Sequence, residues 1–422
     1  MNNLNKNILQ IKYFLVFLFL FKICYSTKIG ILSDTHWDYW YQNGADADKM
    51  CRSGKGKAGE FGYSKCDTPL IMLQSIETFL YYEDIDVFFY LGDALPHKFP
   101  DTNQTALQLV KYFYSSLINL TNEKGIPFFW TLGNTDYEPD GQMPAQKNSF
   151  YYLFADLFQN KFSKDSLLSI QKGGYYTEKF GSNQRIISIN SVMLMEEDQA
   201  INLTNQNPAD MLTWLDQILS EAEINNEKVW ILTHVPLGAK FQSKHFTYRD
   251  DFNELLVKIY QKYYKNIIAV ISGHLHIDSF RLIYDTTHTQ PLVVNFICPA
   301  STYYVMKSYP SYRVLNYNDS NEEISNWIQF VSDTEQDNSQ GFVNFYNYYD
   351  TKTSYGINLL TPKTIHTLLN EMKENQDYFQ SYWNNVHEGI NYDCDSSCES
   401  LELCALEYCL YQEFEICRNS TF

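Results

Sequence analysis

The sequence predicts an α/β protein with a central layer of sheet, followed by a smaller helical region that is rich in cysteine. Short runs of β-branched and aromatic residues alternate with longer amphipathic stretches through the middle of the chain, the pattern of an α/β domain. Five of the nine cysteines fall close to the end of the chain, which marks that end as a cross-linked region. At 422 residues the chain exceeds the usual size of one hydrophobic core, so a large domain with an appendage is expected.

The elements of the larger domain are predicted from the period of their apolar residues. Runs of period two or of continuous apolar residues predict strands, and apolar residues spaced three or four apart predict helices. Strands are expected at residues 28–32, 87–91, 128–132, 185–190, 229–233, 267–272, 279–284 and 292–297. Helices are expected at residues 70–82, 106–120, 151–157, 210–222 and 252–264.

Two changes in composition suggest where the chain is divided. Residues 1–26 combine early lysines with an apolar run and small residues, so we expect a signal peptide that is removed during export. A polar stretch begins near residue 333 and is interpreted as a linker or a long surface loop. We therefore expect a catalytic domain at residues 27–330 and a helical, cysteine-rich region at residues 331–422, with one helix at residues 364–383.

The charge of the chain excludes one class of partner. The formal charge is −18 at pH 7, and loss of the first 26 residues, which hold three lysines and no acids, would make it −21. Binding to a nucleic-acid polymer is therefore not expected. A phosphate-bearing substrate would need a local positive feature to attract it.

The cysteines and glycosylation triplets fit an exported protein. Without Cys24, eight cysteines remain, and an even count in an exported chain predicts disulfides. The pairing within the tail cannot be deduced from the sequence. Glycans are expected at the triplets that start at Asn103, Asn119, Asn202, Asn318 and Asn419. We expect a secreted or lysosome-like location, with no transmembrane span.

Polar residues follow five of the predicted strands at the point where each strand ends. The five signatures are Asp34-Thr-His36, Gly92-Asp93, Gly133-Asn134, Thr233-His234 and Gly273-His274-Leu-His276. Loops at strand ends bring distant residues together while the sheet holds them rigidly. Carboxylate, imidazole and amide groups suit zinc, iron or manganese rather than calcium. Any one signature alone is typical of structural residues, whereas five in this order predict a metal site.

These signatures resemble those of the calcineurin-like metallophosphoesterases, whose motifs run Asp-x-His, Gly-Asp, Gly-Asn-His, a His, and Gly-His-x-His. Nearly the whole chain after residue 26 is similar to the acid sphingomyelinase-like phosphodiesterases, and to the shorter members that lack a saposin-like segment. The segments that carry this likeness are Asp34-Thr-His-Trp-Asp38, Cys51-Arg to Lys65-Cys-Asp-Thr-Pro69, Gly92-Asp-Ala-Leu-Pro-His97, Gly173-Gly-Tyr-Tyr176, His234-Val-Pro-Leu-Gly238, Gly273-His-Leu-His-Ile-Asp278 and the terminal cysteine cluster. The resemblance implies a four-layer α/β/β/α sandwich with a small helical, disulfide-rich C-terminal region.

The resemblance also implies a dinuclear metal site. One metal would be held by Asp34, His36, Asp93 and His276, and the other by Asp93, Asn134, His234 and His274, so that Asp93 bridges them. We expect two divalent ions, with zinc as the metal. Such a pair would attract a phosphate into an acidic protein, clamp the phosphoryl group and acidify a water. The likeness further implies a Cys51–Cys66 disulfide, and Asp278 is expected to orient a ligating imidazole.

The supply of a proton to the leaving group is the point at which the sequence departs from the family. The family places one histidine four residues after the bridging aspartate, present here as His97, and another directly after the asparagine ligand, where this chain has Thr135. In one reading His97 suffices as the acid, with Thr135 donating a hydrogen bond to the phosphate. In the other, the chain is a catalytically weakened metal-binding pseudoenzyme that acts as a ligand-binding protein.

Two related classes of metal enzyme fit the motifs less well. Purple acid phosphatases use a tyrosine ligand three residues after the bridging aspartate, where this chain has Pro96. Cytosolic protein phosphatases carry an arginine just after the Gly-Asp motif, and none is present here. His245, His288, His366 and His387 belong to no motif and are interpreted as surface or core residues, whereas Trp37 and Tyr39 lie beside the first motif and could line the cleft.

The expected function is therefore a secreted dinuclear-metal hydrolase that cleaves phosphodiester or pyrophosphate bonds. The substrate is expected to be a small molecule or a lipid headgroup, in the form of sphingomyelin or of soluble nucleotide or choline-phosphate esters. Peripheral contact with a membrane is compatible with this expectation, although the sequence contains no evident lipid-extracting segment.

Overall fold

The computed structural model describes residues 26–181, 183–240, 242–306, 308–390 and 392–420. The predicted signal peptide, residues 1–26, lies outside these ranges except for its last residue, Ser26. Among the described residues, no helix combines the length and the apolar character needed to cross a bilayer.

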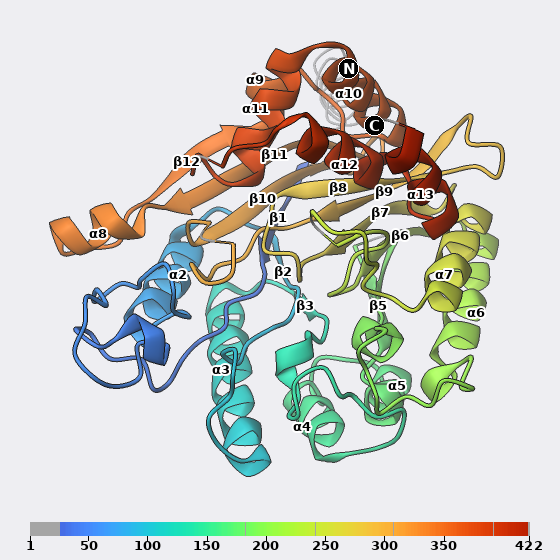
Figure 1. Ribbon diagram of the computed structural model, residues 1–422. Coiled ribbons are helices and arrows are strands. Elements are labelled where there is room, and N and C mark those ends of the chain that lie inside the picture. Colours follow the sequence, from blue (N-terminus) through green and yellow to red (C-terminus); the bar gives the residue numbers. More distant parts are fainter. Residues whose placement is uncertain (1–25, 182, 241, 307, 391, 421–422) are drawn as a thin grey trace, which may run out of the picture.

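Two six-stranded sheets form the centre of the molecule (Figure 1). The first has the order β12-β11-β10-β1-β2-β3, and its strands are β1 (Ser26–Leu32), β2 (Val87–Tyr90), β3 (Phe128–Trp130), β10 (Ser311–Asn318), β11 (Glu323–Ser332) and β12 (Phe345–Asp350). The second has the order β4-β5-β6-β7-β9-β8, and its strands are β4 (Tyr176–Phe180), β5 (Gln184–Ser188), β6 (Lys228–Leu232), β7 (Ile267–Ser272), β8 (Ser279–Tyr284) and β9 (Pro291–Ile297).

Each sheet contains a block of parallel strands, which occupies one half of the first sheet and the middle of the second. β1, β2 and β3 pair in parallel, as do β5, β6, β7 and β9. The carboxyl ends of parallel strands share one edge of a sheet, so the loops that follow β1, β2, β3, β6 and β7 can meet. This arrangement brings the five sequence signatures toward one region of the molecule.

Aromatic side chains join the two sheets face to face. Trp230 of β6 contacts Phe89 of β2 and Tyr317 of β10, with ring centroids 6.1 and 5.2 Å apart. Phe296 of β9 meets Trp327 of β11 edge-on at 4.9 Å. Alternate residues of a strand point to opposite faces, which is why Phe89 faces the other sheet while Tyr90 faces a helix.

Helices cover the outer faces of both sheets, so the predicted α/β fold with helix-flanked sheets is confirmed. Figure 1 shows α2 to α5 below the sheets, α6 and α7 at the right, and α9 to α13 above. The helices of the larger region are α2 (Leu70–Tyr82), α3 (Asn103–Lys124), α4 (Ser149–Leu157), α5 (Lys164–Gly173), α6 (Met211–Ile224) and α7 (Asp250–Lys262). Those that follow are α8 (Thr334–Gln340), α9 (Thr351–Tyr355), α10 (Pro362–Glu374), α11 (Gln376–Val386), α12 (Ser396–Glu407) and α13 (Tyr411–Ser420).

Two local expectations are corrected by the structure. The polar stretch after residue 333 is the short helix α8 rather than a linker or loop, because Asp333 caps its first backbone N–H groups. The single helix expected at residues 364–383 is two helices, α10 and α11, since Asn375 ends the first and caps the second.

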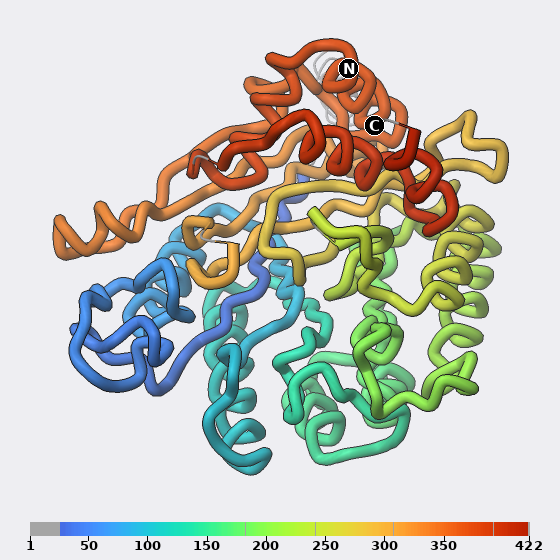
Figure 2. The backbone as a smooth tube through the Cα atoms, viewed as in Figure 1, coloured from blue at the N-terminus to red at the C-terminus, as the bar shows by residue number. Residues whose placement is uncertain are grey.

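The loop that follows β1 is held by a disulfide and by α8. Cys51 and Cys66 are bonded, as predicted from the resemblance. Asn338 of α8 accepts a hydrogen bond from the Phe61 backbone N–H at 2.9 Å and donates one to the Gly62 carbonyl at 3.0 Å. Figure 2 shows this irregular loop in blue at the side of the molecule, near α2 and α8.

The C-terminal helices are cross-linked and packed onto the second sheet. Disulfides join Cys394 to Cys398 and Cys404 to Cys417, and α10 and α12 pack against β8. The even count did not predict that two cysteines would stay unpaired. Cys298 and Cys409 are free thiols, and burial raises the pKa of each to about 12.

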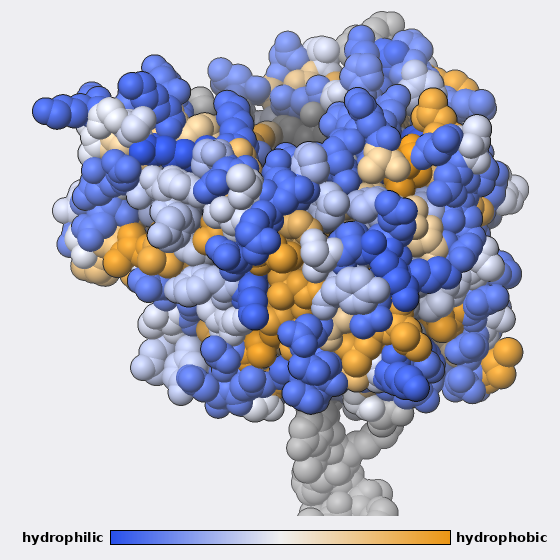
Figure 3. Space-filling model, turned by 90° about the horizontal axis from the view of Figure 1, so that it is seen from below, coloured by the Kyte–Doolittle hydropathy of each residue, from blue (hydrophilic) through white to orange (hydrophobic). Residues whose placement is uncertain are grey.

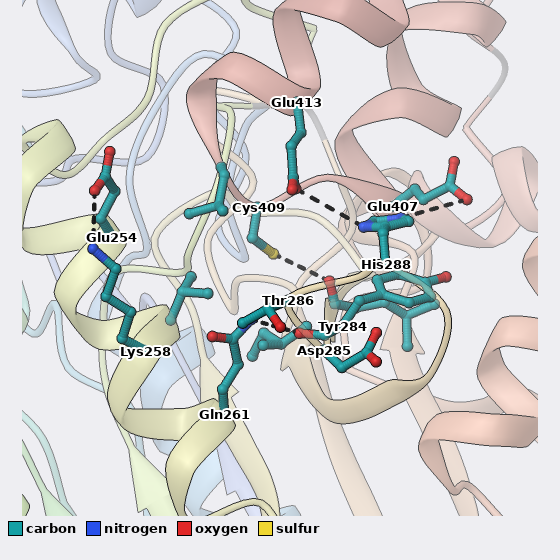
Figure 4. Close-up of a pocket in the computed structure, with 14 residues that line it drawn as sticks. Glu254, Lys258, Gln261, Tyr284, Asp285, Thr286, His288, Glu407, Cys409 and Glu413 are labelled. Carbon is teal, nitrogen blue, oxygen red and sulfur yellow. Dashed lines mark hydrogen bonds and ion pairs between the residues drawn. The ribbon is translucent and has the colours of Figure 1, made fainter.

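A cavity of about 250 Å³ lies between α7, the β8–β9 hairpin and the last two helices (Figure 4). His288 stacks between Tyr284 and Tyr408, with ring centroids 4.0 and 4.6 Å away. Its two ring nitrogens lie 4.0 and 3.9 Å from carboxylates of Glu407 and Glu413. These contacts agree with the structural interpretation of His288.

The face of the molecule seen from below is predominantly hydrophilic, as Figure 3 shows, with apolar side chains gathered toward its middle. The surface is thus mixed in character, as is usual for globular proteins.

Candidate metal centre

The first cluster contains Asp34, His36, Asp93 and His276, all of them buried. The Nε2 atoms of His36 and His276 are 3.1 Å apart. His36 Nε2 lies 3.4 Å from Asp93 Oδ2, and His276 Nε2 lies 3.5 Å from Asp34 Oδ1. The residues come from the ends of β1, β2 and β7, so four potential ligand atoms converge from three loops.

The second cluster contains Asp93, His234 and His274, with Asn134 beside them. Asn134 Oδ1 lies 3.0 Å from His234 Nε2 and 2.9 Å from His274 Nδ1. Asp93 Oδ2 lies 3.2 Å from His234 Nε2. The structure therefore brings all seven of the predicted ligand residues together, and the same Asp93 oxygen faces both clusters.

Backbone carbonyls fix the orientation of two of the rings. His36 Nδ1 lies 2.9 Å from the Leu95 carbonyl oxygen, and His234 Nδ1 lies 2.8 Å from that of Leu91. A carbonyl only accepts, so each Nδ1 carries a hydrogen. When the ring is neutral, the lone pair of each Nε2 is then directed into the cluster, where a metal ion could take the place of a proton.

Several of these side chains stand on a backbone conformation that residues with a Cβ seldom adopt. A left-handed φ costs a non-glycine residue on the order of 1–3 kcal/mol and persists where the surroundings over-determine it. The predicted ligands with such values are Asp34 (49°), His36 (44°), Asp93 (66°), His274 (67°) and His276 (57°). Strain at five positions of one site is a mark of function rather than of packing.

Glycines next to the clusters make room for the carboxylates. A Cβ on Gly133 would lie 2.2 Å from Asp93 Oδ1, and one on Gly273 would lie 2.4 Å from Asp34 Oδ2 and 2.1 Å from Ser33 Oγ. No side chain fits at either position without displacing a carboxylate. This close approach explains the glycine that precedes the polar residue in two of the sequence signatures.

Burial shifts the pKa values within the clusters. It raises the pKa of Asp34 to about 7, and together with neighbouring imidazoles it lowers the pKa of His274 and His276 to about 3. Burial alone would lower the pKa of His234, but the nearby Asp93 raises it to about 9. Neutral imidazoles are metal ligands, and buried carboxylates need a compensating positive charge. The composition of the two clusters therefore suits two metal ions.

One buried carboxylate that sequence reasoning missed ties two of the loops together. Asp136 Oδ2 accepts hydrogen bonds from the backbone N–H groups of Asp93 at 3.0 Å and Gly133 at 2.8 Å. Its Oδ1 accepts one from the Ala94 N–H at 3.0 Å. Only its place two residues after Asn134 could have indicated this role, because the Asp93 and Ala94 contacts span more than forty residues of sequence.

His97 and Thr135 both lie beside the clusters. The His97 ring stacks on His36 with centroids 3.9 Å apart, and its Nδ1 lies 2.9 Å from Asp67 Oδ1. Burial alone would lower the pKa of His97, but Asp67 raises it. The backbone N–H of Thr135 donates to Asp93 Oδ1 at 2.8 Å, and its buried hydroxyl has no hydrogen-bond partner among the described residues. That hydroxyl is an unpaired donor next to the clusters.

The expectation for Asp278 was wrong. Its carboxylate pairs with Arg313 Nη2 at 2.5 Å and accepts a hydrogen bond from the Tyr349 hydroxyl, rather than orienting an imidazole. Of the two residues beside the first motif, Trp37 is buried, whereas Tyr39 is 62% exposed.

A helix-flanked pair of sheets with buried carboxylate–imidazole clusters at the strand ends defines a metal-dependent phosphoesterase. Residues 27–278 match the family described as calcineurin-like phosphoesterase, and residues 289–421 match the acid sphingomyelin phosphodiesterase C-terminal region. The chain belongs to the calcineurin-like phosphoesterase family and carries the C-terminal region of the acid sphingomyelinases.

The similar proteins are phosphodiesterases by name. The chain is 30% identical to sphingomyelinase phosphodiesterase C of Dictyostelium discoideum, over 96% of this chain and 97% of that protein. It is 28% identical to cyclic GMP-AMP phosphodiesterase SMPDL3A of Rattus norvegicus, over 89% of this chain and 88% of that protein. It is 27% identical to acid sphingomyelinase-like phosphodiesterase 3b of Homo sapiens, over 90% and 87%. The chain is thus a metal-dependent phosphodiester hydrolase.

Proposed function

We propose that this protein is a secreted phosphodiesterase that uses two zinc ions to cleave a phosphodiester or pyrophosphate bond of a small molecule or a lipid headgroup. The observation that carries the proposal is the position of Asp93 Oδ2, 3.4 Å from His36 Nε2 and 3.2 Å from His234 Nε2. One carboxylate oxygen between two sets of nitrogen ligands is the arrangement of a bridging ligand.

The proposed ligands divide as the two clusters do. Asp34, His36, Asp93 and His276 would hold one ion, and Asp93, Asn134, His234 and His274 the other. When bound, the two ions would attract the phosphate, polarise its P–O bonds and make water more acidic.

Residues of the chain handle the proton and the phosphate. The water oxygen becomes bonded to phosphorus, and the bond from phosphorus to the leaving oxygen breaks. His97 gives its proton to that leaving oxygen, and the proton released by the water restores His97. The unpartnered Thr135 hydroxyl would donate a hydrogen bond to a phosphoryl oxygen.

The names of the relatives support two classes of substrate. The similar proteins are named for sphingomyelin and for cyclic GMP-AMP, so a lipid headgroup and a nucleotide are both candidate diesters.

Three disulfides favour an oxidising compartment, which supports export and a secreted or lysosome-like location. Glycans at the five triplets and peripheral membrane contact belong to the same proposal.

Turnover of an activated diester by the zinc-loaded protein tests the proposal. Bis(p-nitrophenyl) phosphate should be hydrolysed by the wild type, and Asp93→Ala should abolish hydrolysis. Metal analysis should find about two equivalents per chain in the wild type. Fewer than two equivalents would contradict the dinuclear site, whereas two equivalents without turnover would contradict catalysis alone.

The alternative function is a metal-binding pseudoenzyme, and the replacement of the family histidine by Thr135 favours it. Thr135→His and His97→Ala separate the two readings. On a diester with a poor leaving group, such as methyl phenyl phosphate, a catalyst that relies on His97 should lose activity in His97→Ala. If the wild type is no more active than Asp93→Ala while Thr135→His gains turnover, the pseudoenzyme reading is correct.

A further inference from the structure

Asp67 binds His97 through both of its carboxylate oxygens. Oδ1 lies 2.9 Å from His97 Nδ1, and Oδ2 accepts a hydrogen bond from the His97 backbone N–H at 2.8 Å. Asp67 is completely buried, whereas 22% of the His97 side chain is exposed. The two contacts fix both the backbone of His97 and the rotation of its ring.

Arg52 holds the other side of the same residue. Its Nη2 donates to the His97 carbonyl at 2.8 Å, and its Nη1 donates to the Lys98 carbonyl at 2.7 Å. Its Nε pairs with Asp38 Oδ2 at 2.7 Å. A planar guanidinium with three anchored nitrogens is a rigid support, so the segment at His97 is held from two directions.

The Cys51–Cys66 disulfide joins these two supports. Cys51 directly precedes Arg52, and Cys66 directly precedes Asp67. Both cysteines are buried. The residues that hold His97 are thus each bonded to one half of a single cross-link, although they are fifteen positions apart in the sequence.

We infer that Asp67 is the positioning residue for His97, and that the disulfide-closed loop at residues 51–66 serves to hold Asp67 and Arg52 in place around it. The inference rests on the proposed function, in which His97 supplies the proton to the leaving group. It concerns the geometry and tautomer of the ring.

The two ring nitrogens of His97 have different roles in this arrangement. A carboxylate accepts hydrogen bonds, so Asp67 keeps a hydrogen on Nδ1 of His97. The exchangeable proton is then restricted to Nε2, the nitrogen that can face a leaving oxygen. An imidazole without such a partner can adopt the other tautomer or rotate, and it then delivers its proton poorly.

The dependence of rate on the leaving group tests this role in the full, zinc-loaded chain. Methyl p-nitrophenyl phosphate releases a stable anion that needs no proton, whereas methyl phenyl phosphate releases a poorer leaving group. Asp67→Asn should lower kcat by about 10- to 100-fold on the phenyl ester and by less than about threefold on the nitrophenyl ester. Zinc content should stay at the wild-type value.

A matched control separates positioning from general stability. Glu227 is another buried carboxylate, and it accepts a hydrogen bond from Arg185 Nε at 2.6 Å just before β6, at the end of that strand opposite to His234. Glu227→Gln should change the rates on the two esters by the same factor. If Asp67→Asn also lowers kcat on the two esters by the same factor, the inference is wrong.

Nitrogen NMR of the imidazole rings gives a second readout that needs no turnover. The His97 signals, assigned by their loss in His97→Gln, should show a hydrogen on Nδ1 in the wild type and a shift toward the other tautomer in Asp67→Asn. An unchanged tautomer overturns the inference whatever the activity. Absence of wild-type turnover, with the tautomer shift present, instead overturns the proposed function.

The disulfide is tested by a double variant. The double variant Cys51→Ser, Cys66→Ser should raise the ratio of kcat on the nitrophenyl ester to kcat on the phenyl ester by about 3- to 30-fold, with zinc retained. If the double variant does not fold, Arg52→Met takes its place in the experiment, and the same rise in the ratio is expected. An unchanged ratio in a folded variant removes the loop from the inference.

Discussion

Asn134 donates a hydrogen bond from its amide Nδ2 to Asp140 Oδ1 at 2.8 Å. This contact settles which end of the amide faces the second cluster, because the nitrogen is turned to Asp140 and the carbonyl oxygen to His234 and His274. An amide that rotates by half a turn would present hydrogens to the site instead of a ligand oxygen.

Loss of this contact should weaken the second metal site. Asp140→Ala is expected to lower the affinity of the second proposed metal site for added zinc by about 10- to 100-fold, because the Asn134 amide is no longer held. Zinc titration with a competing chelator measures the effect. Glu138→Ala, which removes a carboxylate from the same loop, is the control and should leave both affinities unchanged; equal losses in the two variants would contradict the role of Asp140.

A methyl group on Gly273 should displace a ligand. Gly273→Ala places a Cβ 2.4 Å from Asp34 Oδ2, so the carboxylate must move and zinc binding should fall. We also expect destabilisation by about 1–3 kcal/mol from overpacking. Gly125→Ala, at the left-handed end of α3, is the comparison, because its φ of 70° strains an alanine while nothing lies within 4 Å of the new Cβ. That variant should lose stability and keep its zinc.

The pair of Arg313 and Asp278 should be sensitive to removal of either partner. Both side chains are buried, and their closest atoms are 2.5 Å apart. Arg313→Met leaves a buried carboxylate without its counter-charge, which is expected to cost about 3–5 kcal/mol of unfolding free energy in a denaturant titration. Lys28→Met breaks the exposed pair with Asp84 and should have a much smaller effect in the same titration, because exposed ion pairs contribute little. Similar losses in the two variants would refute the difference in burial as the cause.

Glu388 should make the protein less stable as the pH rises. Its carboxyl group is buried, and burial raises its pKa well above the usual value in the folded state. Between the unfolded pKa, about 4.3, and the higher folded pKa, the folded chain keeps a proton that the unfolded chain has lost. Stability is therefore complete below the unfolded pKa and falls by about 1.4 kcal/mol per pH unit through this window.

Glu388→Gln tests that dependence, because glutamine keeps the shape of the side chain without its titration. The difference in unfolding free energy between variant and wild type should increase with pH above about 5. Glu374→Gln, which replaces an exposed carboxylate at the end of α10, is the control variant. A difference for Glu388→Gln that does not vary with pH would show that the carboxyl is not protonated in the folded state.

The strands and helices that carry the site could be predicted because their residues are apolar with a clear period. Residues 70–82 were predicted with the observed bounds of α2, and residues 267–272 and 279–284 with those of β7 and β8. β10 and β11 were missed because their inward positions include Arg313 and Gln329, which hydrogen-bond to each other inside the sheet. When the hydrogen bonds of buried polar residues are made by a partner distant in the sequence, the apolar pattern alone does not predict their strand.

The predicted and the missed residues of the site differ in how far their partners lie along the chain. The seven proposed ligands stand in short motifs next to strand ends, so their positions follow from local sequence. Asp67, Asp136 and Asp140 act through hydrogen bonds to other loops or to an amide, and no motif gives their partners. Orientation of the ligands depends on such contacts, and they become visible only when the loops are assembled.

The last strand of the first sheet has a consequence for how much of the chain is needed. β12 (Phe345–Asp350) pairs with β11 and lies beyond the polar stretch near residue 333. A shortened protein that ends near residue 332 would have the ten-residue β11 as its edge strand in place of the six-residue β12, with a longer row of unpaired N–H and C=O groups. Such an edge recruits strands from other molecules, so the shortened protein would tend to aggregate. The C-terminal region therefore acts as a guard against self-association as well as a cover for the second sheet.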